Sequence, residues 1–120
     1  MKKLSDCEFC ILNIVWENEP LSSRELTARV AGVLGWKRTT TYTVLKKLCD
    51  GGYLSNRDAV VTATVPREEV LAEEYRVRIA PAFSHSLPDL LSAALRGVTL
   101  TDREARSLKR LIDAHREKAE

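Results

Sequence analysis

The alternation of apolar and polar residues predicts three helices followed by a β-hairpin within the first 66 residues. Apolar positions recur at helical spacing over residues 6–17, from residue 22 to Gly32 and Gly35, and from residue 38 to Gly51-Gly52. Residues 53–65 alternate in the manner of two strands joined around residues 57–59. This order is typical of a winged helix-turn-helix domain, so we predict a mostly α fold with a small β-hairpin, an α+β arrangement, in residues 1–66.

Helical periodicity returns after Pro66, in three short amphipathic segments. The first contains Pro81, which should kink or end it, and Ser86 and Thr101 are expected to cap the other two. These helices are too apolar on one side to stand alone, and little chain remains to cover them. We therefore predict that residues 67–120 form a helical dimerisation region, in which two subunits meet through Leu71, Tyr75, Ile79, Phe83, Leu87, Leu90, Leu91, Leu95, Leu108, Leu111 and Ile112.

The third predicted helix has an unusual polar face. Its inward side carries Thr41, Leu45 and Leu48, and the second helix likewise shows a narrow apolar face of Leu26, Val30 and Val33. Hydroxyl groups and cations gather on the outward side of the third helix, where a merely solvated helix would carry stronger helix formers. Small donors near a helix N-terminus with cations further along suit contact with DNA. The candidate DNA-binding residues are Lys37, Arg38, Thr39, Thr40, Tyr42, Thr43, Lys46 and Lys47, with Asn56 and Arg57 on the hairpin.

Charge strengthens this interpretation, because the net charge of +2 over 120 residues conceals a local excess. Residues 36–57 contain five cations and one anion. No apolar run approaches the ~18–20 residues that a membrane span requires. The basic start of the chain leads into a charged amphipathic helix instead of a signal-peptide core. We therefore expect a cytoplasmic protein that does not insert into a membrane.

The cysteines and histidines give little support to catalysis or metal binding. Cys7 and Cys10 form a single C-x-x-C without a second ligand pair, so no metal is expected. Cys7 falls on the apolar stripe of the first helix, whereas Cys10 falls on the polar stripe and is a candidate oxidation site. His85 and His115 have no nucleophile placed beside them. We predict no catalytic residue, no cofactor and no small-molecule substrate, and an enzyme is the least supported class.

Motifs along nearly the whole chain resemble the penicillinase repressors of the BlaI/MecI type, a group that also includes copper-responsive regulators. The resemblance lies in Leu4-Ser5-Asp6-x-Glu8, Ile14-Val15-Trp16, Trp36, Thr41-Tyr42-Thr43-Val44-Leu45-x-x-Leu48, Gly52-Tyr53-Leu54, Phe83-x-x-Ser86-Leu87 and Leu100-Thr101-x-x-Glu104. It implies a dimeric winged-helix repressor that binds a palindromic operator. We accordingly predict a homodimeric, sequence-specific DNA-binding transcriptional repressor of a pseudo-palindromic site.

The resemblance also concerns regulation, and here the chain departs from the family pattern. Copper-responsive relatives carry a cysteine-rich C-terminal motif, and no cysteine follows Cys49. Antibiotic-responsive relatives are cut by a membrane sensor protease at an Asn-Phe bond, which is absent from the corresponding place near Ala93 and Ala94. The resemblance implies such a protease as a partner and proteolysis of the arm as a signal. Two alternatives remain: a winged-helix protein-interaction module that does not bind DNA, and a thiol-redox-responsive repressor.

Overall fold

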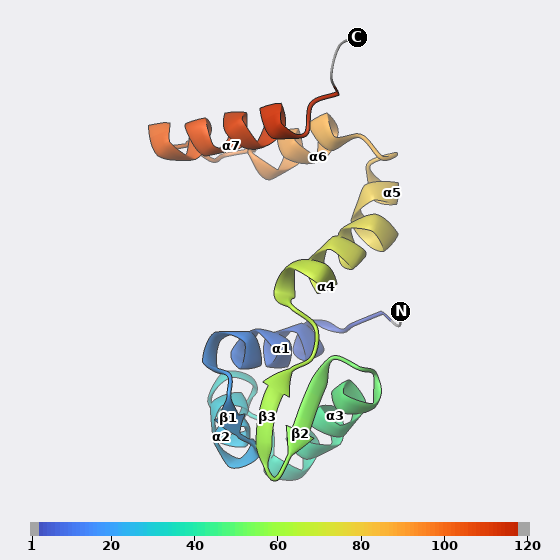
Figure 1. Cartoon of the computed structure of the whole chain (residues 1–120), viewed down its shortest axis with the longest axis vertical. Helices are drawn as coiled ribbons and strands as arrows, with labels where there is room; N and C mark the ends of the chain where they lie inside the picture. Colours follow the sequence, from blue (N-terminus) through green and yellow to red (C-terminus); the bar gives the residue numbers. More distant parts are fainter. Residues whose placement is uncertain (1–2, 118–120) are drawn as a thin grey trace. The chain divides into compact units, whose positions relative to one another are not determined.

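The structure is a computed structural model that describes residues 3–117 and divides into two compact units, residues 1–75 and 76–120. In its described residues the first unit has four helices and a small antiparallel sheet of three strands, and the first three helices are those predicted (Figure 1). Its elements are α1 (Asp6–Asn18), β1 (Leu21–Ser22), α2 (Ser23–Leu34), α3 (Arg38–Asp50), β2 (Leu54–Arg57), β3 (Val60–Ala63) and α4 (Arg67–Glu74). The predicted fold class, mostly α with a winged helix-turn-helix domain, is confirmed.

Short polar side chains start α1 and α2 at the predicted places. At α1 the Ser5 hydroxyl accepts from the Glu8 backbone N–H at 3.1 Å, and the Glu8 carboxylate accepts from the Ser5 N–H at 2.8 Å. The Ser22 hydroxyl accepts from the backbone N–H of Glu25 at 2.9 Å. The carboxylate of Glu25 pairs with Arg29 at 3.2 Å, so only half of this predicted capping box is present.

The end of α2 differs in part from the prediction. Gly35 ends the helix with a φ of +68°, a conformation that glycine adopts without a steric cost. Gly32, which was also expected to end it, lies within the helix. Val33 was predicted to face the core with Leu26 and Val30, but it is 64% exposed while those two are fully buried. The prediction was wrong for Val33 because the last turn of α2 directs Leu34, and not Val33, toward the core.

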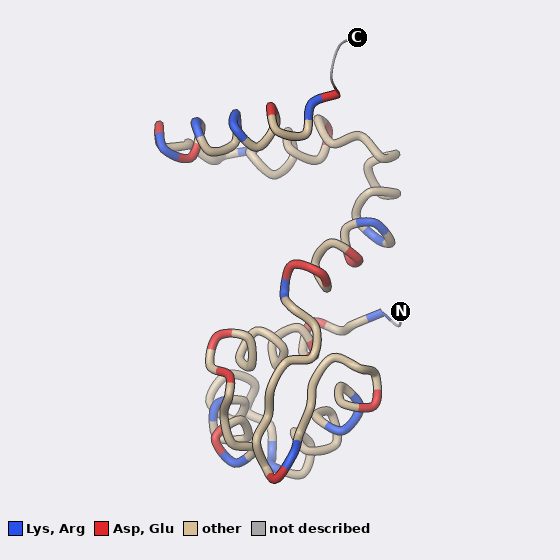
Figure 2. Tube along the Cα trace, viewed as in Figure 1, with Lys and Arg blue, Asp and Glu red and all other residues tan. Residues whose placement is uncertain are grey.

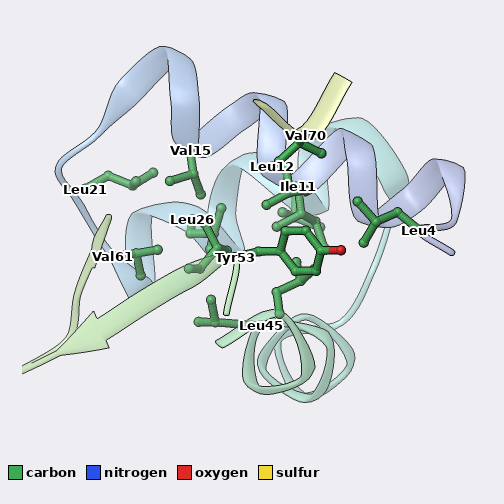
Figure 3. Packing of buried hydrophobic residues seen from close by; sticks show 13 residues of the cluster. Leu4, Ile11, Leu12, Val15, Leu21, Leu26, Leu45, Tyr53, Val61 and Val70 are labelled. Atoms are coloured by element: carbon green, nitrogen blue, oxygen red, sulfur yellow. The ribbon is translucent and has the colours of Figure 1, made fainter. Parts of the chain in front are cut away.

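The core forms where the helices meet the sheet (Figure 3). Side chains from α1, α2, α3, the strands and α4 converge there: Leu4, Ile11, Leu12, Val15, Leu21, Leu26, Val30, Leu45, Leu48, Tyr53, Leu54, Val61 and Val70. Each buried Val or Leu contributes about 1.5–3 kcal/mol of hydrophobic free energy. The burial of Leu45 and Leu48 holds α3 in one rotation about its axis.

The sheet has one strand more than the sequence pattern predicted. β1 pairs with β3, with Leu21 opposite Val61, and β3 pairs with β2, with Leu54 opposite Ala63, so the strand order is β1-β3-β2. Val61 is therefore in the central strand and is fully buried. The β2–β3 turn passes through Asp58 and Ala59, both with positive φ, which is the geometry of a tight hairpin. β1 went unpredicted because it has only two residues, one of which, Ser22, also caps α2.

Contacts at the beginning of α4 attach this helix to α1. The guanidinium of Arg67 lies 5.5 Å from the ring centroid of Trp16 and donates to Asn13 at 3.2 Å and to Glu17 at 3.4 Å. The indole N–H of Trp16 donates to the Val65 carbonyl at 3.0 Å. Val70 completes the attachment by entering the core with 3% of its surface exposed. The predicted boundary at Pro66, between a DNA-binding domain and a dimerisation region, stays a prediction. The first compact unit extends to residue 75 and therefore includes α4.

The second unit is helical, as predicted. Helical structure continues through a π-helix, η1 (Tyr75–Ile79), into α5 (Ala80–Ala82), which contains Pro81 and ends one residue after it. The other helices are α6 (Leu87–Ala94) and α7 (Asp102–Ala114), capped by Ser86 and Thr101. The Thr101 bonds also lower the pKa of the Glu104 carboxyl. Within the described residues, no helix is both long and apolar enough to cross a membrane.

Replacing Thr41 with Val should stabilise the protein. The Thr41 side chain is fully buried, and its hydroxyl has no hydrogen-bond partner among the described residues. Such a hydroxyl costs stability, so Thr41→Val should raise the free energy of unfolding by about 1 kcal/mol in urea denaturation. Thr40→Val, at an exposed position of the same helix, is the control and should change it by less than about 0.5 kcal/mol. A loss of stability for Thr41→Val would show that its hydroxyl is satisfied.

Candidate nucleic-acid interface

The outward face of α3 presents the hydroxyl groups and cations that the sequence predicted. Thr39, Thr40, Thr43, Lys46 and Lys47 are exposed, as are Lys37, Arg38 and Tyr42. The opposite side is the buried row of Thr41, Leu45 and Leu48. The Thr43 hydroxyl donates to the Thr39 carbonyl at 3.0 Å, which holds its rotamer and leaves the oxygen lone pairs at the surface. The structure thus brings these candidate residues together on one helix, and their role in binding DNA stays a prediction.

The beginning of α3 differs from the beginnings of α1, α2, α6 and α7. A Ser or Thr side chain caps each of those four helices, and each has an acidic residue in its first turn. At α3 the N-cap residue is Lys37, whose side chain makes no capping hydrogen bond, and the first turn contains no acidic residue. The free N–H groups, the positive end of the helix dipole and the Lys37 and Arg38 cations all favour an anion. A backbone phosphate is such an anion.

The hairpin of β2 and β3 lies beside α3 and carries the other predicted contacts. Asn56 and Arg57 are exposed on β2, and Figure 2 marks the cations of α3 and of this strand in the same unit. Arg57 is opposite Val60, whose side chain is 44% exposed. The hairpin therefore offers one cation and one amide, with an exposed apolar side chain near its turn.

Cys49 lies on the inner side of α3, partly buried against the core. Burial and the neighbouring Asp50 carboxylate raise the pKa of the Cys49 thiol, while a hydrogen bond from the backbone N–H of Asn56 lowers it by a smaller amount. Cys49 packs against the core from the inner side of α3, and Leu54 of β2 is buried in the same core. The helix and the hairpin are therefore held together by shared core packing.

The other cysteines and the histidines form no reactive centre. Cys7 and Cys10 are both half-buried free thiols, so Cys10 is less exposed than its place on the polar stripe of α1 predicted. Its neighbourhood includes α4, which the helical pattern of α1 could not reveal; a redox role for Cys10 stays a prediction. His115 bonds the Leu111 carbonyl at 3.0 Å, and His85 is exposed in a turn. Among residues 3–117 no cluster of side chains could hold a metal ion.

The helices from α4 onward keep much of their apolar surface uncovered within one chain. Exposed fractions lie between 38% and 57% for Leu71, Ile79, Leu87, Leu91, Leu95, Leu111 and Ile112, whereas Tyr75, Phe83, Leu90 and Leu108 are half-buried. Val77 and Val98 are similarly exposed and were missed, because neither falls on the four-residue spacing used to find the others. Ala93 and Ala94 are exposed at the C-terminal end of α6.

The chain is similar to one known protein family and to several solved structures. Residues 4–114 match the family described as penicillinase repressor, whereas no curated protein matches. A multiple antibiotic-resistance repressor (MarR) from Listeria monocytogenes is similar in fold, with 16% identity, a TM-score of 0.52 and coverage of 92% of this chain and 71% of that chain. A MarR family protein of Mycobacterium tuberculosis gives 26% identity, a TM-score of 0.46 and coverage of 92% of this chain and 73% of that chain. The complex of that protein with DNA gives 27% identity, a TM-score of 0.48 and coverage of 92% of this chain and 76% of that chain.

The uncapped start of α3 can be tested by removing its first cation. Lys37→Ala should weaken binding to all duplex DNA similarly and reduce the slope of log K against log salt by about 1, because one fewer phosphate is neutralised. Fluorescence anisotropy over a salt titration measures both effects. Lys109→Ala, which removes a cation from α7, is the control and should leave the slope unchanged. An equal change in both variants would mean that general charge, and not this helix start, attracts DNA.

Proposed function

Because the chain belongs to the penicillinase repressor family and is a DNA-binding repressor, we propose that it acts as a homodimer on a pseudo-palindromic operator. The outward face of α3 would enter the major groove, with the β2–β3 hairpin beside it. The observation that carries this proposal is the combination of an uncapped, cationic start of α3 with a row of exposed hydroxyls and lysines behind it. Repression would follow from occupancy of the operator, without chemistry.

The face divides into two roles according to position along the helix. Lys37, Arg38, Thr39 and Thr40 lie at its first turn, where side chains and N–H groups can grip phosphates. Tyr42, Thr43 and Lys46 are exposed further along the helix and would contact base edges. Lys47 would add a phosphate contact, and Asn56 and Arg57 would reach an adjacent groove.

The uncovered apolar surface of the arm supports a homodimer. Large aliphatic side chains are exposed on α4, η1, α6 and α7, and a monomer rarely leaves so many uncovered. A second copy of the same arm is the most economical cover, because twofold symmetry lets one surface pair with itself. Dimerisation would also give specificity, because two copies of α3 would bind two half-sites at a fixed spacing. A random sequence seldom contains both half-sites at that spacing.

Proteolysis of the arm would relieve repression, by resemblance to relatives that a membrane sensor protease cuts. The exposed Ala93 and Ala94 lie between the apolar surfaces of α6 and α7. Cutting there would separate the two surfaces and remove the cover that each subunit gives the other. The absence of an Asn-Phe bond means that such a protease would need a different side-chain preference.

Base and phosphate contacts can be separated by measuring two kinds of DNA. Thr43→Ala and Lys46→Ala should each cost about 1–3 kcal/mol on the operator and much less on random duplex, because only the operator presents the matching base edges. The operator would first be obtained by selection from genomic DNA. Lys37→Ala is the comparison and should lose similar affinity on both. Equal losses on both DNAs for all three variants would contradict the assignment of roles.

The dimer can be tested on α7, where the altered side chains are exposed. Leu111→Asp combined with Ile112→Asp should turn the dimer into a monomer, because carboxylates cannot be buried between subunits without a partner. Arg106→Gln combined with Arg110→Gln lowers the charge equally on the polar face and is the control. Analytical ultracentrifugation gives the mass, and anisotropy gives operator affinity, which should fall together in the first variant. A wild-type chain that sediments as a monomer while binding the full operator would contradict the proposal.

A further inference from the structure

Two thiols lie one turn apart on α1, and the proposed repressor function does not use them. Cys7 and Cys10 both belong to this helix, and both are free and half-buried, so each keeps some contact with solvent. Residues three positions apart on a helix lie on the same face. The two side chains are therefore neighbours that one small molecule can contact together.

The spacing of the two positions does not suit a disulfide bond. Cβ atoms three residues apart on a helix are about 5–6 Å from each other. An unstrained disulfide needs them about 3.5–4.5 Å apart, so a direct bond between Cys7 and Cys10 would distort the first turns of α1. A bridge with one more atom between the two sulfurs spans the wider gap without that distortion.

The number of available ligands limits which atom can form such a bridge. A structural zinc ion takes four protein ligands, whereas residues 3–117 bring together no group of three or more Cys, His, Asp or Glu side chains that could hold a metal ion. The bridging atom must therefore be satisfied by two sulfurs. Soft elements prefer sulfur ligands, and trivalent arsenic that carries one substituent of its own has two positions left for them.

We propose that Cys7 and Cys10 together bind a trivalent arsenical, R–As=O, as a chelate in which arsenic is bonded to both sulfurs. Two As–S bonds form and the As=O bond breaks. The two thiol protons leave with that oxygen as one water molecule, so arsenic stays trivalent and no oxidant is consumed. The inference goes beyond the proposed repressor function and does not require DNA to be present.

The pair is a better site for an arsenical than a single thiol is. Once one As–S bond has formed, the second thiol is held beside the arsenic at an effective concentration of about millimolar or more. Cys10 also lines an open hollow beside α1, so a small reagent can approach it. Cys49 packs against the core and is the single cysteine of α3, so an arsenical there forms one As–S bond, which a free thiol displaces.

Phenylarsine oxide tests the proposal on the full chain without DNA, in excess glutathione, which removes arsenic that is bound to one thiol alone. Mass spectrometry of the intact protein should show one phenylarsine group per chain. Cys7→Ser and Cys10→Ser should each weaken binding at least tenfold, because either change leaves one thiol of the pair. Cys49→Ser, which removes the thiol of α3, is the matched control and should stay within twofold of wild type. Circular dichroism checks that each variant is folded.

A second measurement uses the wild-type chain and so does not depend on how the variants fold. Trypsin releases Cys7 and Cys10 in one peptide, residues 4–24, and Cys49 in another, residues 48–57. After treatment with the arsenical, both thiols of the first peptide should resist iodoacetamide in urea, whereas Cys49 should be alkylated. Addition of 2,3-dimercaptopropanol, which is itself a dithiol, should make both thiols reactive again.

Unchanged binding in Cys7→Ser or in Cys10→Ser would overturn the proposal, since one thiol would then be enough. Arsenic retained on Cys49, or a first peptide with only one protected thiol, would overturn it as well. Operator binding that persists in any of these cases leaves the repressor function standing.

Discussion

The burial of Leu45 and Leu48 in the core fixes the rotation of α3, and the surface proposed to bind DNA depends on that rotation. With these side chains inside, Thr39, Thr43 and Lys46 must face outward, since helix geometry places them on the other side. The same core also holds the hairpin, because Leu54 and Val61 are buried in it. One packing arrangement therefore presents hydroxyls, cations and hairpin together.

The helices and the outward face of α3 could be predicted from the sequence because their signals are local. Ser5, Ser22, Ser86 and Thr101 each accept a backbone N–H three residues ahead, as their spacing indicated. Periodicity likewise separated the buried Leu45 and Leu48 from the exposed residues of α3. Such signals work because capping and helix rotation depend on residues only a few positions apart.

The features that the sequence did not reveal depend on distant neighbours. β1 exists because Leu21 meets Val61, forty residues further along, and no local pattern reports that pairing. Cys10 was expected on an open polar stripe but is half-buried, and Val33 was expected inside but is exposed. Both residues lie where α1 and the end of α2 meet α4, and contacts of Arg67 and Val70 set the position of α4. The periodicity of one helix cannot show which other helix lies against it.

Footprinting tests most directly the central claim, that two copies of the α3 face occupy one symmetric site. Hydroxyl-radical cleavage of a duplex selected from genomic DNA, with the full chain bound, would show the contacted nucleotides on both strands. Two protected half-sites related by pseudo-twofold symmetry, with centres about 10 base pairs or a multiple of that apart, are the expected result. A single protected half-site at saturation, or no protection at low salt, would contradict the claim.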